Sequence, residues 1–521
     1  METEARPVVA DFSAYRTISA RLSQEIGRVQ GRSEGYRFVC CQRALIRGCA
    51  HRIHGTDRMA NLIRRADLSD SEVLNRSTVL LFGTVGIPLA VIGYPIAIWL
   101  PPFYAGELGI SLATVGLMLM LARFSDVITD PLIGFLSDKW RTRWGRRKPW
   151  ILAGTPIMVF GAFKLFIPPD ESGSLYLLFW ISFMFLGSTM VSLTYGAMGA
   201  ELSSDYHQRS RVTAAREGFV LLGLIIAAFV PAIVEFMGER DAGPVLEAMA
   251  WTIGLLMPLT VFLLLAFVKE PVVEAHKNIP FREGLRHVWR NGPMKRVLMI
   301  VLLVTFAESF RNALSVFFMR DLIGVPAIGI LYFYYFASGL IAIPAWLLLG
   351  KKIGKHKAFA LCMVAVSCVS VATFFLERGQ VTEFTALFIA KGACFGGLQF
   401  LPLSMLADVV DVDSARSGGR RAGVVFAISG MTVKLAVAIG TGVSLQVLGF
   451  VGYIADREQA INNGSFELMS LAVLYAIVPP LFFGAALWLT WHYPLTAERH
   501  ARLRGLMERR AVRMAEKASG L

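Results

Sequence analysis

The sequence predicts an all-α membrane protein in which twelve transmembrane helices form two pseudo-symmetric six-helix halves. Three observations predict this fold class: an apolar composition, a series of apolar stretches of membrane-spanning length, and basic residues concentrated in alternate loops. Of the 521 residues, 55% are hydrophobic and only 17% are charged, and the mean hydropathy is +0.55. Soluble domains carry about 25% charged residues, so this chain is too apolar for that class.

The net charge of +14 raises the question of a nucleic-acid partner, but the distribution of the charge argues against one. The basic residues lie between the apolar stretches and in the two ends of the chain, where such residues orient a membrane protein. We therefore expect a lipid bilayer as partner and no nucleic acid. We find no nucleotide loop, nucleophile–base pair or metal cluster, so we expect no enzyme and no cofactor beyond a coupling ion.

The predicted spanning helices are the stretches that reach the required length, since a helix needs about 20 mostly apolar residues to cross the hydrocarbon core. They lie at 79–100, 112–137, 149–167, 175–199, 217–237, 248–268, 296–318, 326–349, 357–376, 383–408, 422–448 and 468–492. The longest connection, at 269–295, divides them into two halves, at 78–268 and 296–493. Outside the halves lie a basic extension at 1–77 and a basic tail at 494–521.

The loops predict the orientation of these helices. Six Lys/Arg lie between the second and third spans and seven in the segment 269–296, whereas each loop on the opposite side carries at most one. Basic loops mark the cytoplasmic side, so we expect both termini in the cytoplasm. Gly145-Arg146-Arg147-Lys148 after span two and Gly354-Lys355-His356-Lys357 after span eight echo each other. Two related six-helix halves with a substrate site between them are the plan of the major facilitators.

Three charges are predicted to lie deep in the membrane. Asp126 and Asp130 are four residues apart, so they share one face of a helix. Counted from Ser137 and Ala422 at about 1.5 Å per residue, Asp130 lies roughly 10 Å deep, Asp126 roughly 16 Å and Lys434 roughly 18 Å. Each costs about 2.5–3.5 kcal/mol on insertion scales. We therefore expect them to face a water-filled cavity and to pair with one another.

Two interpretations of the acid pair compete. Asp126 and Asp130 can bind Na⁺ or share a proton, or they can form structural ion pairs with Arg123 or Lys434. The functional interpretation is favoured because intramembrane acids are functional by default. Repulsion between the two carboxylates would favour protonation of one of them, so the choice between Na⁺ and H⁺ stays open. No other metal is expected.

Charges at the expected cytoplasmic ends of the helices are candidates for a conformational latch, with ordinary solvated loop charges as the alternative. They are Asp138, Arg143, Arg146, Asp408 and Asp411.

Three further charges lie in predicted spans of the second half. Glu308 and Arg311 can neutralise each other on one helix face, or contact a substrate. Lys391 has no partner in the sequence and either extends to the outer surface or attracts an anionic substrate group.

These motifs resemble the glycoside–pentoside–hexuronide:cation symporter family of the major facilitator superfamily, typified by the melibiose permease. The signature is Asp126-x-x-x-Asp130-Pro131-x-x-Gly134, followed by Arg143-Trp144-Gly145-Arg146-x-Lys148-Pro149-Trp150. Ala407-Asp408-Val-Val-Asp411, the Lys434 of Met-Thr-Val-Lys, and Arg216 also match. The resemblance covers residues 78–495.

The resemblance implies a cation site built by Asp126 and Asp130 with help from the fourth span, at Thr189 and Ser192. We further expect Arg216 and Lys434 to contact the substrate, and Lys434 to link the acid site to the opposite half. Three positions that bind sugar in the melibiose permease are different here: they are Pro88, Ser192 and Gly196. The cation half of the site is therefore partly kept, and the sugar half is largely replaced.

We thus expect a secondary transporter that works by alternating access and couples Na⁺ or H⁺ to symport of a small organic solute, sugar or glycoside-like by resemblance. We expect a monomer in a bacterial inner membrane. One alternative is a lysolipid carrier of the same fold, because relatives resembling animal lysolipid transporters share the acid pair and the lysine. A second is a non-transporting membrane scaffold or sensor that binds partners through the basic extension.

Overall fold

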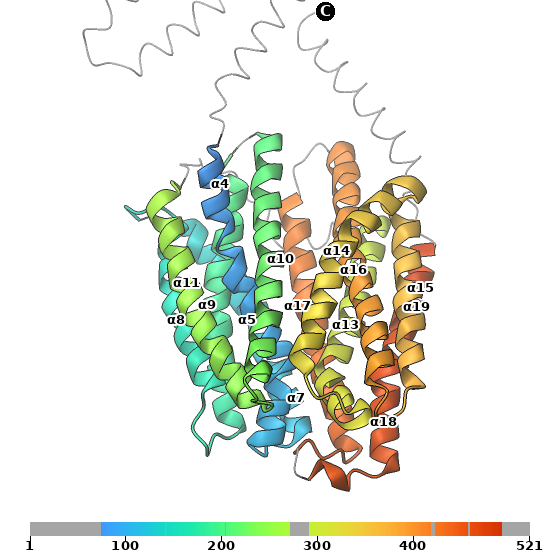
Figure 1. Ribbon diagram of the computed structural model, residues 1–521. Helices are drawn as coiled ribbons and strands as arrows, with labels where there is room; N and C mark the ends of the chain where they lie inside the picture. Colours follow the sequence, from blue (N-terminus) through green and yellow to red (C-terminus); the bar gives the residue numbers. More distant parts are fainter. Residues whose placement is uncertain are drawn as a thin grey trace, which may run out of the picture. The chain divides into compact units, whose positions relative to one another are not determined.

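The computed structural model describes residues 74–140, 142–203, 205–270, 291–417, 422–456 and 459–491 (Figure 1). The tail predicted at 494–521 lies outside the described residues, as do most of the extension at 1–77 and of the linker at 269–295. The roles of these three segments therefore stay predictions. The chain from Leu74 onward forms one compact unit.

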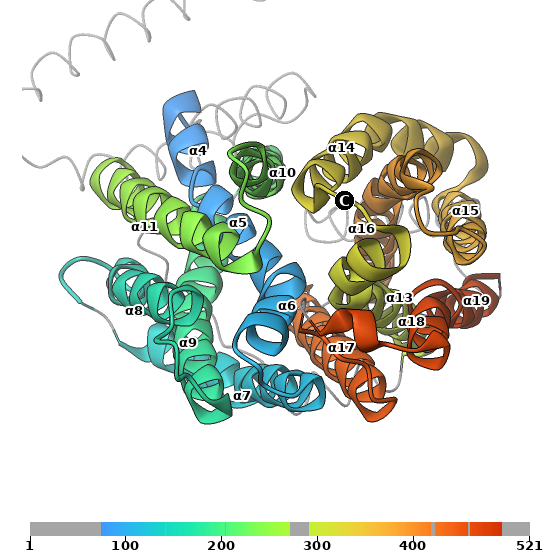
Figure 2. The ribbon, with the colours of Figure 1, turned by 60° about the horizontal axis from the view of Figure 1, so that its bottom comes forward.

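Twelve helical segments in the described residues are long and apolar enough to cross a membrane, which confirms the predicted fold class. Each overlaps one predicted span. Arg76–Ile98 to Ala242–Phe267 supply the first six, and Gly292–Ile323 to Ser465–Trp491 supply the second six. Figures 1 and 2 show the two groups side by side, with α4–α11 in the first half and α13–α19 in the second.

The first half contains α4 (Arg76–Gly83), α5 (Gly86–Ile98), α6 (Leu100–Pro102), the π-helix η1 (Phe103–Glu107), α7 (Leu112–Lys139), α8 (Lys148–Phe166), α9 (Ser174–Glu201), α10 (Tyr206–Phe236) and α11 (Ala242–Phe267). The second half contains α13 (Gly292–Phe317), the π-helix η2 (Phe318–Ile323), α14 (Ile328–Ile353), α15 (Lys355–Phe374), α16 (Val381–Ser417), α17 (Ala422–Phe450), the 3₁₀-helix η3 (Ala460–Asn462), α18 (Ser465–Ala476) and α19 (Val478–Trp491).

Helix α10 differs most from its prediction, because it begins at Tyr206 and the predicted span begins at 217. Hydropathy locates the part of a helix that lies in the membrane, whereas the first turns of α10 carry arginines. The start is instead marked by Asp205, whose side chain accepts a hydrogen bond from the backbone N–H of Gln208 at 2.8 Å. This is the N-cap arrangement that acidic residues favour.

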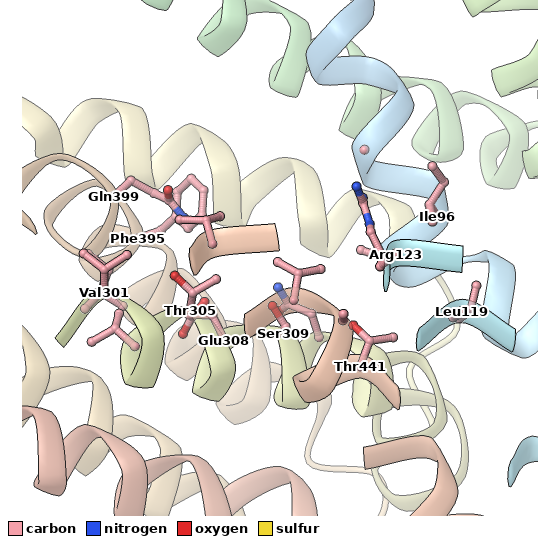
Figure 3. A pocket seen from close by; sticks show the side chains of 18 of the residues that line it. Ile96, Leu119, Arg123, Val301, Thr305, Glu308, Ser309, Phe395, Gln399 and Thr441 are labelled. Atoms are coloured by element: carbon pink, nitrogen blue, oxygen red, sulfur yellow. The ribbon is translucent and has the colours of Figure 1, made fainter. Parts of the chain in front are cut away.

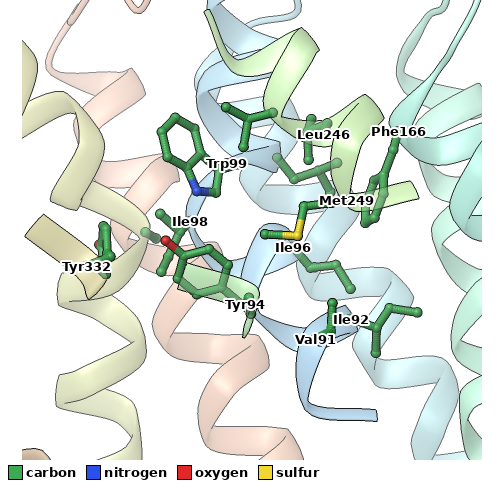
Figure 4. Close-up of a cluster of buried hydrophobic side chains, with 14 of the residues drawn as sticks. Val91, Ile92, Tyr94, Ile96, Ile98, Trp99, Phe166, Leu246, Met249 and Tyr332 are labelled. Atoms are coloured by element: carbon green, nitrogen blue, oxygen red, sulfur yellow. The ribbon is translucent and has the colours of Figure 1, made fainter. Parts of the chain in front are cut away.

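Helix α5 lies at the centre of the first half and is buried on nearly all sides. Its apolar side chains pack against α8 and α11 in the cluster of Figure 4, which includes Val91, Ile92, Ile96, Phe166, Leu246 and Met249. A helix that is hydrophobic all round is expected to be buried. Tyr94 on the same helix points toward Tyr332 of α14, and the two rings meet edge to face with centroids 5.6 Å apart. Helix α5 therefore also contacts the second half.

The two halves meet along α7 and α17 through glycines. A Cβ atom on Gly116 would lie 2.9 Å from the carbonyl oxygen of Gly442, and one on Gly442 would lie 2.7 Å from the Cβ of Met120. Backbones approach this closely only where side chains are missing, as in other membrane helix pairs. The glycines thus bring together α7 and α17, the same two helices that carry the acid pair and Lys434.

The halves are also joined at the end opposite the basic loops, which we call the opposite end. There the Glu235 carboxylate of α10 accepts hydrogen bonds from the backbone N–H groups of Ile328 and Gly329, each at 2.8 Å. These donors belong to the first turn of α14, so an acid of the first half caps a helix of the second. Gly329 permits the approach, since a Cβ there would lie 2.7 Å from the backbone of Ala232.

Candidate functional site

The structure brings the three deep charges together in one cluster that spans the two halves. Lys434 of α17 donates to both carboxylate oxygens of Asp130 at 2.8 Å, and its Nζ lies 3.3 Å from Oδ2 of Asp126. Both acids come from α7, where their four-residue spacing places them on one face. Asp126 is 2% exposed. The lysine therefore supplies positive charge from the second half to a carboxylate pair in the first.

Thr189 of α9 completes this group, which we call the cation cluster: Asp126, Asp130, Thr189 and Lys434. The Thr189 hydroxyl donates to Oδ1 of Asp130 at 3.0 Å and lies 3.5 Å from Nζ of Lys434. Ser192 is half-buried on the same helix and makes no side-chain hydrogen bond to the cluster in the described part of the chain. Of the two predicted α9 residues, only Thr189 thus contacts the acids.

Asp126 is held from a second side by Arg123, which sequence reasoning considered only as a structural partner. The guanidinium Nη1 lies 3.5 Å from Oδ2 of Asp126, and its carbon lies 3.9 Å from the ring centroid of Phe185. Oδ1 of Asp126 is buried and has no hydrogen-bond partner among the described residues. Buried polar atoms are nearly always satisfied, so this oxygen is available to an additional ligand.

A cavity of about 450 Å³ lies between the halves, next to the cation cluster. Its walls come from α5, α7 and α9 on one side and from α13, α16 and α17 on the other. Figure 3 shows Arg123, Leu119 and Ile96 facing Thr305, Glu308 and Gln399 across it. A separate pocket of about 10 Å³ is lined by Arg123, Asp126, Asp130 and Lys434. That volume is about the size needed for one water or ion, and Arg123 lines both spaces.

Glu308 and Arg311 form a buried pair on α13, with Nη2 of Arg311 2.8 Å from Oε2 of Glu308.

Lys391 of α16 is only 1% exposed, so it does not extend to the surface. Its Nζ lies 3.5 Å from the hydroxyl of Ser370 and 4.9 Å from the ring centroid of Tyr475. Lys391 is therefore directed into the packed second half, and it does not line the cavity.

The predicted latch residues at the basic end of the first half form an ion-pair network centred on a residue that the sequence did not single out. Arg147 is 6% exposed and donates to Asp138 at 2.6 Å and to Glu201 at 3.0 Å. Arg146 also binds Glu201, at 2.5 Å. Arg143, by contrast, is exposed and lies over the ring of Trp144. The network ties α7, α8 and α9 together within one half.

Glu270 adds a second link that sequence reasoning missed. Its carboxylate accepts hydrogen bonds from the backbone N–H groups of Arg146, Arg147 and Lys148, at 2.7, 2.8 and 3.2 Å. These are orphan donors at the start of α8, where a negative charge is also favoured by the helix dipole. The only signal in the sequence was an acid between α11 and the basic linker.

The second half has its own ion pair at the basic end. Lys355 of α15 donates to both carboxylate oxygens of Asp408 on α16, at 2.8 Å. The side chain of Asp411 lies outside the described residues.

Arg216 is the other predicted substrate contact. It binds its neighbour Glu217 at 2.6 Å and is not part of the cavity lining. The structure therefore places Lys434, but not Arg216, beside the acid pair.

Comparison with known proteins identifies the family. A family model described as "MFS/sugar transport protein" matches residues 81–497. The inner membrane symporter YicJ of Escherichia coli (strain K12) is 25% identical over 462 residues, covering 85% of this chain and 96% of YicJ. The sodium-dependent lysophosphatidylcholine symporter 1-A of Danio rerio is 24% identical over 464 residues, covering 80% of this chain and 85% of the relative.

The fold is shared with solved transporters. The crystal structure of the nucleoside transporter NupG matches with a TM-score of 0.57 at 13% identity, covering 80% of this chain and 100% of NupG. Together with the twelve spanning helices, these matches confirm a multi-pass membrane transporter, not an enzyme, that handles a small molecule. The chain belongs to the MFS/sugar transport protein family, the melibiose permease-like family of the major facilitator superfamily.

Proposed function

We propose that this protein is a symporter that uses a gradient of Na⁺ or H⁺ to accumulate a small organic solute, sugar or glycoside-like, by alternating access. It would work as a monomer in a bacterial inner membrane. One observation carries the proposal: a buried carboxylate pair, held by a lysine of the opposite half, borders a cavity between the halves.

The coupling ion would bind at the cation cluster. Hard cations prefer oxygen ligands, and Asp126, Asp130 and Thr189 offer carboxylate and hydroxyl oxygens there. A proton would bind one of the same carboxylates. Either ion competes with the Lys434 ammonium for the negative charge of the acids, so its binding weakens a link between the halves. The ion thereby changes the free energy difference between conformations, which is what coupling requires.

Arg123 can couple ion binding to solute binding. It contacts Asp126 on one side and lines the cavity on the other. An ion that takes over the negative charge of Asp126 weakens the hold of this acid on Arg123. A solute that touches Arg123 changes the same contact. Because binding free energies are linked reciprocally, each ligand then favours the other.

The cavity favours an uncharged solute. Before the coupling ion binds, the charges that the described residues place around it are balanced, with Asp126, Asp130 and Glu308 opposed by Arg123, Lys434 and Arg311. A net charge on the solute would therefore have no matching excess charge in the wall. Apolar walls with a few hydroxyl and amide groups suit the ring of a sugar or the aglycone of a glycoside. The family description, sugar transport, supports this class.

A lysolipid is the second candidate. The similarity to the lysophosphatidylcholine symporter and the largely apolar cavity walls favour it. Its zwitterionic head group would also fit a balanced set of charges. A non-transporting scaffold has no comparable support, because the family consists of transporters.

The acid pair provides the test. In proteoliposomes with an imposed Na⁺ or H⁺ gradient, Asp126→Asn and Asp130→Asn should each abolish gradient-driven accumulation of the solute while the protein remains inserted. The matched control is Glu247→Gln, which changes an exposed carboxylate on α11 and should leave accumulation unchanged. Normal accumulation by both Asp variants would falsify the proposal.

A further inference from the structure

Helix α13 presents a polar face to the cavity. Thr305, Glu308, Ser309 and Asn312 all line it, and their spacing of three, four and seven residues from the first places them on one side of a helix. Figure 3 shows Thr305, Glu308 and Ser309 in a row along this helix. Most of the remaining lining is aliphatic. The polar face of α13, as we call these four residues, is therefore the largest group of hydrogen-bonding side chains in the cavity wall.

Glu308 keeps one carboxylate oxygen that no hydrogen bond within the described part of the chain satisfies. Its side chain is 9% exposed, and Oε2 is occupied by Arg311. Its other oxygen, Oε1, is buried without a hydrogen-bond partner among the described residues, and so is Nη1 of Arg311. A carboxylate oxygen in this condition, on a residue that lines a cavity, indicates a missing donor.

Arg311 fixes the orientation of the neighbouring amide. Its Nη2 lies 3.0 Å from Oδ1 of Asn312 and 3.3 Å from the hydroxyl of Tyr335. An arginine can only donate, so Asn312 must present its oxygen to Arg311 and keep its NH₂ group for another partner. Arg311, at 2% exposed, is thus a positioning residue that holds an acceptor and a donor at the cavity wall.

From this geometry, and resting on the proposed function, we infer that the polar face of α13 is the solute-recognition site and that it reads hydroxyl groups of an uncharged solute. Glu308 accepts a hydrogen bond from one hydroxyl, Asn312 donates to another, and Thr305 and Ser309 can do either. Because Arg311 neutralises the carboxylate of Glu308, neither an anionic nor a cationic group of the solute gains electrostatic attraction there.

This inference moves recognition into the second half of the molecule. The positions expected to bind sugar by resemblance are in the first half, at Pro88, Ser192 and Gly196, and only Ser192 has a polar side chain. None of the three lines the cavity. The cation cluster and the solute site then lie mainly on different halves, with Arg123 and Lys434 between them.

The test uses the purified full-length protein and 4-nitrophenyl glycosides as probes: the β-glucoside, its mono-deoxy analogues, and the β-glucuronide, which adds one negative charge. Affinity is measured by calorimetry for the unchanged protein and for Glu308→Gln, Asn312→Ala and the control Glu247→Gln. We expect the unchanged protein and the control to bind the glucoside more tightly than the glucuronide, and both α13 variants to lose at least tenfold in affinity.

The deoxy analogues separate recognition from a general loss of structure. Removal of one particular hydroxyl should weaken binding to the unchanged protein severalfold but leave binding to Asn312→Ala unchanged, because the partner is already absent. The inference is overturned if both α13 variants bind the glucoside as the unchanged protein does, or if the glucuronide binds more tightly. If the unchanged protein binds and accumulates no glycoside, the solute class of the proposed function fails, and this inference fails with it.

Discussion

Lys434 occupies the place where the proposed coupling ion would bind. Its ammonium contacts both acids, and the two carboxylates are 3% and 11% exposed. Buried charges are tolerated only when they are paired, and removal of one partner typically costs about 3–5 kcal/mol. The lysine thus stabilises the ion-free protein in the way that a bound ion would. In the ion-free protein the two carboxylates are therefore paired with Lys434. An ion that enters the cluster displaces this pairing.

This role predicts the behaviour of Lys434→Gln. Without the ammonium, Asp126 and Asp130 repel each other in a buried site, so the midpoint of thermal unfolding should fall. Added Na⁺, or a lower pH that protonates one acid, should restore stability by more than it does in the unchanged protein, since the competitor is gone. Thermal unfolding in NaCl and in choline chloride across a pH series measures this effect.

Lys355→Gln is the matched control, because it breaks another lysine–aspartate pair, at the basic end and away from the cavity. It should show no added response to Na⁺ or pH. The competition between Lys434 and the ion is contradicted if Lys434→Gln gains no more stability from Na⁺ or from acid than the unchanged protein does.

At the residue scale the sequence predicted the members of the cation cluster better than the contacts between helices. Depth counted along each helix placed Asp126, Asp130 and Lys434 at similar levels, and the structure has them in contact. Arg147 and Glu201 were missed as a pair because they lie on different helices. Local spacing reveals partners three or four residues apart, such as Glu308 and Arg311, but no pairing across helices.

At the scale of elements, hydropathy predicted the twelve spans and left their ends uncertain. Span length follows from the thickness of the hydrocarbon core, whereas a helix can continue beyond its apolar stretch, as α10 and α16 do. Which helices face each other was not predictable from hydropathy, since every span is apolar. The pairing of α7 with α17 depends on small residues whose role becomes visible only when both helices are in place.

The α7–α17 contact predicts opposite outcomes for two glycines of the same helix. Gly442→Ala places a Cβ 2.7 Å from that of Met120, so the helices must move apart, and overpacking of this kind costs about 1–3 kcal/mol. Gly430→Ala meets no atom within 4 Å and should be neutral or stabilising, because alanine favours helix by about 1 kcal/mol. Thermal unfolding and transport rates of the two variants measure the difference. Equal stability would show that the glycine does not set this distance.

At the scale of the whole molecule, the contacts between halves are uneven. At the basic end, the ion pairs of Arg147 and of Lys355 stay within their own halves. At the opposite end, Glu235 of the first half caps α14 of the second. The described residues therefore correspond to a state that is closed at the opposite end. The loop charges predict that the basic end is cytoplasmic, and with that orientation the state is an inward-facing conformation.

Opening of the opposite end must break the cap, because Glu235 and the first turn of α14 belong to different halves. Hydrogen bonds to a charged group contribute about 1.5–3 kcal/mol each. Loss of even one such contribution shifts a two-state equilibrium by about tenfold or more, at 1.4 kcal/mol per factor of ten. Glu235→Ala should therefore increase the population in which the opposite end is open. A bound solute should then escape more readily through that end.

Spin labels on exposed loops at the opposite end can report this shift. Asp170 follows α8 in the first half and Arg378 follows α15 in the second, and both side chains are exposed. In a background without native cysteines, cysteines at these two sites should give mainly one population of label distances in the parent protein. Glu235→Ala should add a longer-distance population. Glu239→Ala, which removes an exposed carboxylate just beyond α10, should leave the distribution unchanged. Identical distributions in the two variants would mean that the cap does not hold this end closed.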